Sequence, residues 1–145
     1  MELPPGLRLN FENNPSREDR NFIDEGLGAY NAPFLADNRY SYFGVFVRDE
    51  SQAIRAGLIG YCYAGWLFVN LLWVHADLRR LGLGQMLLGE AERHGIEFGC
   101  HSSFLDTFSF QGPDFYPKFG YQEFARLDYP PDHQRIFLKK QLISE

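Results

Sequence analysis

The chain has 145 residues, of which 45% are hydrophobic and 17% aromatic, and it carries a formal net charge of −5. This length and composition fit the core of one globular domain and exclude a disordered protein or two full-sized domains. The negative charge argues against nucleic acid as a partner, since nucleic acid is bound through clustered Lys and Arg, and it suits a cationic substrate.

The first third of the chain predicts a strand, a helix and a second strand. Apolar and polar residues alternate over Leu7–Phe11, which indicates a strand. Ser16 is a suitable N-cap for a helix that runs to about Leu27 or Ala29. The strand pattern returns at Tyr42–Arg48 and is followed by a polar turn.

A long apolar stretch, Ala56–Val74, is compatible with two structures. Its length is just enough for a helix to span a bilayer. However, it contains several glycines and many β-branched and aromatic residues, and arginines flank both ends, so we favour a buried hairpin of Ile54–Tyr63 and Trp66–Val74. The second arm shows almost no alternation, which predicts a central strand covered on both faces. We therefore expect no membrane association.

The second half of the chain predicts a long helix over about Gly84–Phe98, because its apolar residues recur at helical spacing. The elements expected after it are a strand at Ser103–Thr107, a short helix at Gly112–Phe119, and strands at Tyr121–Leu127 and Arg135–Gln141. This alternation of elements, with no linker or repeat, predicts a single mixed α/β domain over residues 1–145.

Cysteine and histidine spacing gives no sign of a metal site or a disulfide. Cys62 and Cys100 form neither a metal-ligand pair nor a disulfide framework, and His94, His101 and His133 lack ligand spacing. No signal peptide is visible at the N-terminus, so we expect a reduced, cytoplasmic protein without a metal.

The most informative segment is the turn Arg79–Gly84, which lies between a predicted strand and a predicted helix. The start of a helix presents unpaired N–H groups and the positive end of the helix dipole, and Gly82 and Gly84 let the backbone approach a phosphate closely. The segment lacks the Lys-Ser/Thr pair of a Walker loop, and Leu87 occupies the position of the third Rossmann glycine. By itself the turn predicts either an anion site or close helix–strand packing.

The pattern Arg-x-x-Gly-x-Gly in this turn matches the acetyl-coenzyme A motif of the GNAT superfamily of N-acetyltransferases. Phe115–Tyr121 resembles the family's Phe-Tyr-x-Lys-x-Gly-Phe signature, with Tyr as the last residue. The resemblance extends over about Ile54–Leu142, includes the strand end Leu71–His75, and at Leu105–Pro113 is similar to a subgroup of small bacterial members. It implies the GNAT fold, a mixed sheet of about seven strands that splays into a V at its central strand and is flanked by helices.

The resemblance also implies acetyl-coenzyme A as co-substrate. Its pantetheine arm is expected on the backbone of Leu72, Trp73 and Val74. Its pyrophosphate is expected on the N–H groups of the turn, whose residues are Arg79, Arg80, Leu81, Gly82, Leu83, Gly84 and Gln85. Many members have an Asn that contacts the cofactor, but this chain has Ser109 at that position, which can keep one hydrogen bond.

For catalysis, Tyr116 matches the family tyrosine that protonates the departing thiolate. No motif identifies the general base. Asp106, at a strand end facing the cleft, and His75, after the central strand, are the candidates, and ordinary roles as a loop cap and an exposed polar residue stay open for them. A backbone N–H near Val74 is expected to stabilise the oxyanion.

The implied acceptor is a primary amine of a small molecule or peptide. Substrate residues in this fold come from the first helix, the loop after it and the last hairpin, which here offer aromatic and acidic side chains suited to a cation: Asp24, Glu25, Tyr30, Phe34, Asp37, Tyr40, Tyr129, Asp132 and His133. The alternative function is a non-catalytic acyl-CoA-binding sensor module. The apolar last hairpin is also compatible with pairing in a homodimer.

Overall fold

The structure is a computed structural model that describes residues 1–144, and the chain forms two compact units, Met1–Ala36 and the part from Asp37 onward. In the first unit, α1 (Arg17–Asn31) begins at Ser16, whose Oγ accepts a hydrogen bond of 3.0 Å from the N–H of Asp19. The N-cap prediction is therefore confirmed. The short 3₁₀ helix η1 (Ala32–Phe34) follows α1.

The strand predicted at Leu7–Phe11 is wrong, because these residues are irregular in the structure. Alternation of apolar and polar residues produces a strand only where a neighbouring strand accepts its backbone hydrogen bonds. Unit Met1–Ala36 contains no strand to pair with.

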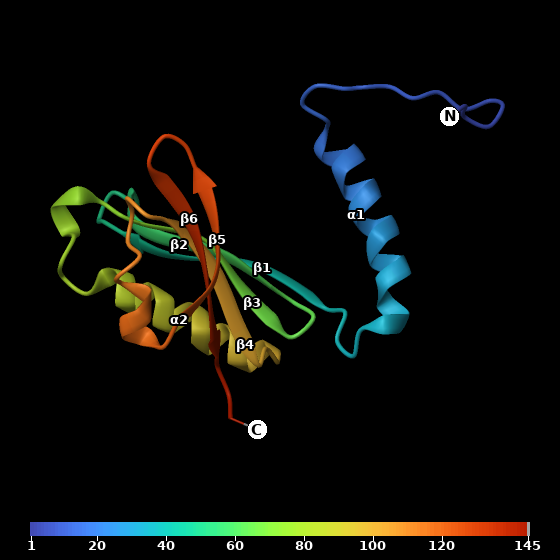
Figure 1. The fold of residues 1–145 in the computed structure, drawn as a ribbon. Helices are drawn as coiled ribbons and strands as arrows, with labels where there is room; N and C mark the ends of the chain where they lie inside the picture. The colour runs from blue at the N-terminus through green and yellow to red at the C-terminus, as the bar shows by residue number, and fades with distance from the viewer. Residues whose placement is uncertain (145) are drawn as a thin grey trace. The chain divides into compact units, whose positions relative to one another are not determined.

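The second unit is built on one mixed sheet of six strands in the order β1-β2-β3-β4-β6-β5, so the expectation of about seven strands is too high by one (Figure 1). Neighbouring strands are antiparallel except β3 and β4, which are parallel and are joined through α2 (Leu83–Phe98). The strands are β1 (Tyr40–Arg48), β2 (Ile54–Tyr63), β3 (Trp66–Val74), β4 (Ser102–Phe108), β5 (Gln122–Tyr129) and β6 (His133–Gln141).

The apolar stretch Ala56–Val74 forms the β2–β3 hairpin, as predicted. The hairpin turns at Ala64 and Gly65, whose φ angles of 54° and 84° are those of a two-residue turn between twisted strands. Within residues 1–144, no helix is long and apolar enough to cross a membrane. The prediction that all of β3 is covered on both faces is wrong beyond Val69, because the exposed residues begin at Asn70.

This change in burial occurs where β3 parts from β4. The parallel ladder joins Trp66–Val69 to Ser102–Leu105 and then ends. At the same point a bulge at Asn70 shifts the register of β3 on β2, which bends the strand. β3 continues to Val74 and β4 to Phe108 without pairing with each other, and this opening between them agrees with the V-shaped splay that the resemblance implied.

Helix α2 packs on one face of this sheet and closes the core of the second unit. Its buried residues are Leu87, Leu88, Ala91 and Gly95, on the face that helical spacing predicted. A Cβ at Gly95 would lie 3.4 Å from the Cβ of Leu67, so glycine permits the helix to approach β3 closely. The helix ends at Gly99, which has a φ of 110°.

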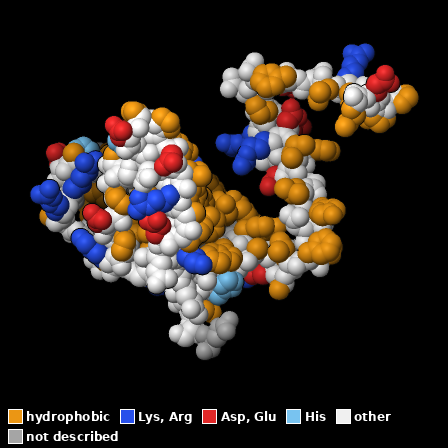
Figure 2. Space-filling view, in the orientation of Figure 1, with side chains coloured by type: hydrophobic (Ala, Val, Ile, Leu, Met, Phe, Trp, Pro, Cys, Tyr) orange, Lys and Arg blue, Asp and Glu red, His pale blue; other side chains and the backbone are white. Residues whose placement is uncertain are grey.

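The opposite face of the sheet is aromatic. The ring of Phe68 on β3 lies 5.1 Å from that of Tyr61 on β2 and 4.8 Å from that of Phe104 on β4. Figure 2 shows hydrophobic side chains gathered over the β1 and β3 part of the sheet. These cross-strand ring contacts stabilise the register of the central strands.

Candidate active site

The turn after β3 offers backbone N–H groups that the protein does not use. Arg80 and Gly82 both adopt left-handed backbone conformations, with φ of 66° and 83°. The first hydrogen bond of α2 runs from the N–H of Met86 to the carbonyl of Gly82 at 3.1 Å. The N–H groups of the first three helical residues therefore find no acceptor among the described residues, and these are Leu83, Gly84 and Gln85.

The two glycines of the turn are needed for different reasons. Gly82 has open space where a Cβ would stand, so its positive φ, and not crowding, favours glycine there. At Gly84 a Cβ would lie 3.2 Å from Cζ of Phe115. The second sequence motif therefore packs directly on the first, a contact that neither motif predicts alone.

The two arginines of the turn differ in how their side chains are held. Nε of Arg79 donates a hydrogen bond of 3.1 Å to the carbonyl of Val74, which ties the turn to the end of β3 and leaves the terminal nitrogens of this guanidinium free. Arg80 is exposed, and its side chain has no ion pair within residues 1–144. Both guanidinium groups thus have N–H donors available to an anion.

The last residues of β3 present a free backbone edge. Leu72 and Trp73 pair with β2 on one side, and the ladder to β4 on the other side has already ended. Ser109 lies just after β4, where its Oγ accepts a hydrogen bond of 3.0 Å from the N–H of Gln134. The hydroxyl hydrogen of Ser109 remains available to a ligand.

Tyr116 opens η3 (Tyr116–Phe119) and is only 8% exposed, with ring centroids of Phe115 and Tyr121 at 5.1 and 5.9 Å. Its hydroxyl makes no hydrogen bond with any described residue, yet the oxygen is not sealed from solvent. Burial, and secondly the charge of Asp106, raises the pKa of Tyr116 to about 12. The phenol is therefore a neutral donor with an unused O–H at physiological pH.

Asp106 lies on β4 beyond the last pairing with β3, with 17% of its side chain exposed. Its Oδ1 accepts a hydrogen bond of 2.8 Å from Nε of Arg135, and this pair raises the pKa of Arg135. Its Oδ2 accepts from no side chain or backbone group that the structure describes. Arg135 is a site residue that the sequence did not reveal, because its pairing with Asp106 depends on the register between β4 and β6.

His75 caps the 3₁₀ helix η2 (Ala76–Leu78). Its Nδ1 accepts a hydrogen bond of 3.1 Å from the N–H of Asp77, and its ring meets that of Trp73 edge-on at 5.9 Å. A neutral imidazole that accepts at Nδ1 carries its proton on Nε2, so its free nitrogen is a donor. His75 accepts a substrate proton only if this cap bond breaks.

A buried polar network lies beside the Tyr116 ring. The hydroxyl of Tyr121 is 2.8 Å from Oε2 of Glu92 and 2.9 Å from Oγ of Ser103. Nζ of Lys140 donates to Oε1 of Glu92 at 2.7 Å. Burial raises the pKa of Tyr121, and the network ties α2, β4 and β6 together. Its function is structural, because every polar atom named here has a protein partner.

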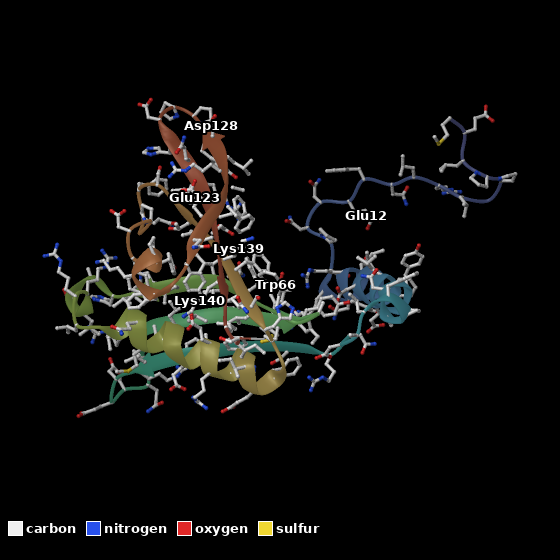
Figure 3. All side chains as sticks on the ribbon, turned by 60° about the horizontal axis from the view of Figure 1, so that its bottom comes forward. Glu12, Trp66, Glu123, Asp128, Lys139 and Lys140 are labelled. Carbon is white, nitrogen blue, oxygen red and sulfur yellow. The ribbon has the colours of Figure 1, made fainter. Side chains whose placement is uncertain are left out.

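Other polar groups lie away from this opening. A surface pocket of about 850 Å³ is lined in part by Trp66, Lys139 and Lys140, at the end of β4 opposite Asp106 (Figure 3). Two histidines make hydrogen bonds to serine side chains: His94 contacts Ser41 and His101 contacts Ser102. Across residues 1–144, no three His, Cys, Asp or Glu side chains are grouped to hold a metal ion.

Comparison with known proteins agrees with this geometry. The family model of the acetyltransferase (GNAT) family matches residues 8–121. The chain is 38% identical over 112 residues to a blasticidin-S acetyltransferase of Streptomyces morookaense, a match that covers 76% of this chain and 82% of that protein.

Solved structures show the same fold. An acetyltransferase of Bacillus cereus ATCC 14579 superposes with a TM-score of 0.76 at 33% identity, covering 91% of this chain and 97% of that one. An aminoglycoside 6'-N-acetyltransferase, solved with coenzyme A, shares the fold with a TM-score of 0.63 at 15% identity, over 72% of this chain and 74% of that one. The chain belongs to the GNAT family of acetyltransferases.

Proposed function

We propose that this protein transfers the acetyl group of acetyl-CoA to a primary amine of a small molecule or peptide by direct attack. The observation that carries the proposal is a set of unused donors on two segments that contact each other: the N–H groups of Leu83, Gly84 and Gln85 at the start of α2, and the hydroxyl of Tyr116, whose neighbour Phe115 packs on Gly84. A pyrophosphate fits the first set, and the free edge at Leu72–Val74 fits the pantetheine arm. The blasticidin-S acetyltransferase relative supports a small-molecule acceptor.

Acetyl-CoA supplies an activated acetyl thioester, and the protein supplies position and protons. A backbone N–H near Val74 donates to the carbonyl oxygen as it gains negative charge. Tyr116 gives its proton to the departing sulfur, since its O–H has no competing acceptor among residues 1–144. Ser109 and the arginines Arg79 and Arg80 offer further hydrogen bonds to the cofactor.

The two base candidates differ in whether their proton-accepting atom is already engaged in a hydrogen bond. Oδ2 of Asp106 is unpaired near Tyr116, whereas Nδ1 of His75 is engaged as a cap. We expect Asp106→Asn to lower kcat/KM about a hundredfold, and His75→Gln to change it less than about threefold. Thiol release at saturating acetyl-CoA measures both, with thermal unfolding to show that each variant folds. The reverse ranking would identify His75 as the base.

The pH dependence follows from the raised pKa of Tyr116, about 12. A protonated phenol is required, and it stays protonated well above the unperturbed tyrosine value of about 10. We therefore expect kcat/KM to rise from pH 7 to 10 as the amine loses its proton, without a fall on the alkaline side. Thiol-release rates across this range are the measurement. A decline with an apparent pKa near 10 would contradict a buried phenol as the acid.

The direct test of function is calorimetric titration with acetyl-CoA, followed by thiol release over a panel of primary amines. Absence of binding at millimolar acetyl-CoA would reject the proposal. Binding without turnover of any amine, with Tyr116→Phe indistinguishable from wild type, would instead support an acyl-CoA-binding sensor module.

We also propose that the chain acts as one domain, in the cytoplasm, and as a homodimer. The match of the family model to residues 8–121 spans both units, which supports one domain. Cys62 and Cys100 are free and buried, which suits a reducing compartment. Strand β5 is an exposed edge of the sheet and can pair between chains. Light scattering that gives the monomer mass would reject the dimer.

A further inference from the structure

An aromatic group lies at the end of β4, beside the β5–β6 hairpin. The rings of Phe108 and Phe110 are stacked, with centroids 5.2 Å apart and planes at 16°. Tyr129 meets Phe108 edge-on at 5.1 Å, and His133 meets Phe110 edge-on at 4.9 Å. We call these four residues the aromatic platform. Figure 3 shows Asp128, the neighbour of Tyr129, at the far end of this hairpin.

The platform is not part of the hydrophobic core. Phe110 is 61% exposed and Tyr129 37%, and neither belongs to the buried cluster under α2. Phe108 itself is partly buried, so the open face of the stacked pair is the outer face of Phe110. An open aromatic surface of this kind is suited to stacking with a flat ligand.

The platform adjoins the opening between β3 and β4. Phe108 follows Asp106 by two residues on the same face of β4, so their Cα atoms are about 7 Å apart. Both lie beyond the last pair of the β3–β4 ladder, on the face opposite the buried residues Leu105 and Thr107. A ligand whose ring lies on the platform can therefore reach the free Oδ2 of Asp106 with an amine carried on a short spacer.

We propose that this face binds the acceptor, and that the acceptor is a cationic amine carrying a planar ring. The ring stacks on the platform and the ammonium group approaches Oδ2 of Asp106 before transfer. Arg135 holds the carboxylate through Oδ1, which leaves Oδ2 for the ligand. The net charge of −5 favours approach of such a cation. This inference rests on the proposed acetyltransferase function and specifies its substrate class.

The experiment compares two acceptors of equal charge and length, 3-phenylpropylamine and 3-cyclohexylpropylamine, which differ in the planarity of the ring. For the wild type we expect KM to be roughly fivefold lower for the phenyl amine, since stacking adds to the area that both rings bury. Phe110→Leu keeps an apolar side chain but removes the flat surface. It is expected to raise KM for the phenyl amine roughly fivefold and to leave KM for the cyclohexyl amine and the Kd of acetyl-CoA unchanged.

The matched control is Phe124→Leu, since Phe124 is 50% exposed on β5 but outside the platform. We expect it to leave both KM values unchanged. If acetyl-CoA does not bind the wild type, the acetyltransferase proposal itself fails. The aromatic acceptor site alone is overturned if acetyl-CoA binds but the two amines have equal KM, if Phe124→Leu acts like Phe110→Leu, or if neither amine is acetylated while another primary amine is.

Discussion

Replacing Tyr116 with Phe is expected to lower kcat about a hundredfold to a thousandfold, which lies within the range for removing a positioned general acid. The Kd of acetyl-CoA and the free energy of unfolding are expected to stay the same. The hydroxyl has no hydrogen-bond partner among the described residues, so its removal leaves no buried group unsatisfied. Phe also preserves the ring contacts with Phe115 and Tyr121. Steady-state thiol release and urea unfolding give the two quantities.

The chain contains a matched control in Tyr121, the neighbouring buried tyrosine. Its hydroxyl contacts Glu92 and Ser103, so Tyr121→Phe leaves buried polar atoms without a partner and is expected to lower the free energy of unfolding by about 1–3 kcal/mol. Its kcat is expected to stay within about threefold of wild type. Tyr116→Phe thus affects rate and Tyr121→Phe affects stability. If both variants lost only stability, Tyr116 would be a core residue and not the acid.

The elements predicted correctly are those fixed by local sequence. The β2–β3 hairpin follows from two strand-forming runs around a glycine turn, and α2 follows from apolar residues at helical spacing. At Leu7–Phe11 the same local signal fails, because an isolated strand lacks a partner for its backbone. The parting of β3 from β4 follows from no local signal, because the bulge at Asn70 has no marker in the sequence. This opening was expected only through the family resemblance.

The candidate site likewise contains features that follow from local sequence and features that depend on strand register. The donors of the turn are backbone groups within one short segment, so their place at a helix start follows from the local pattern, while their use as an anion site stays a prediction. The Asp106–Arg135 pair joins residues 29 positions apart through the register of β4 on β6. Periodicity tells which face of a strand a residue occupies but not which residue lies opposite, so such pairs require the structure.

Replacing Gly82 with Val is expected to weaken acetyl-CoA binding more than about a hundredfold, because the left-handed turn that aims the N–H groups of Gly84 and Gln85 would relax. Losing one or two hydrogen bonds to a charged group costs about 1.5–3 kcal/mol each. The free energy of unfolding is expected to fall by only about 1–2 kcal/mol, the strain of an L-residue at positive φ. No atom lies within 4 Å of the added Cβ to raise that value. Calorimetric titration and urea unfolding measure the two effects.

The variant Gly82→Asn distinguishes a requirement for the left-handed backbone from a requirement for empty space beside residue 82. Asn tolerates the left-handed region far better than Val, so the turn should keep its φ of 83° and the Kd should stay within about tenfold of wild type. If Asn weakens binding as much as Val, the empty space beside Gly82 is where the pyrophosphate passes over the backbone, and absence of a Cβ is what the site requires. If both variants lose stability and affinity to the same extent, Gly82 serves packing of the turn, and the anion site must be sought elsewhere along the β3–β4 opening.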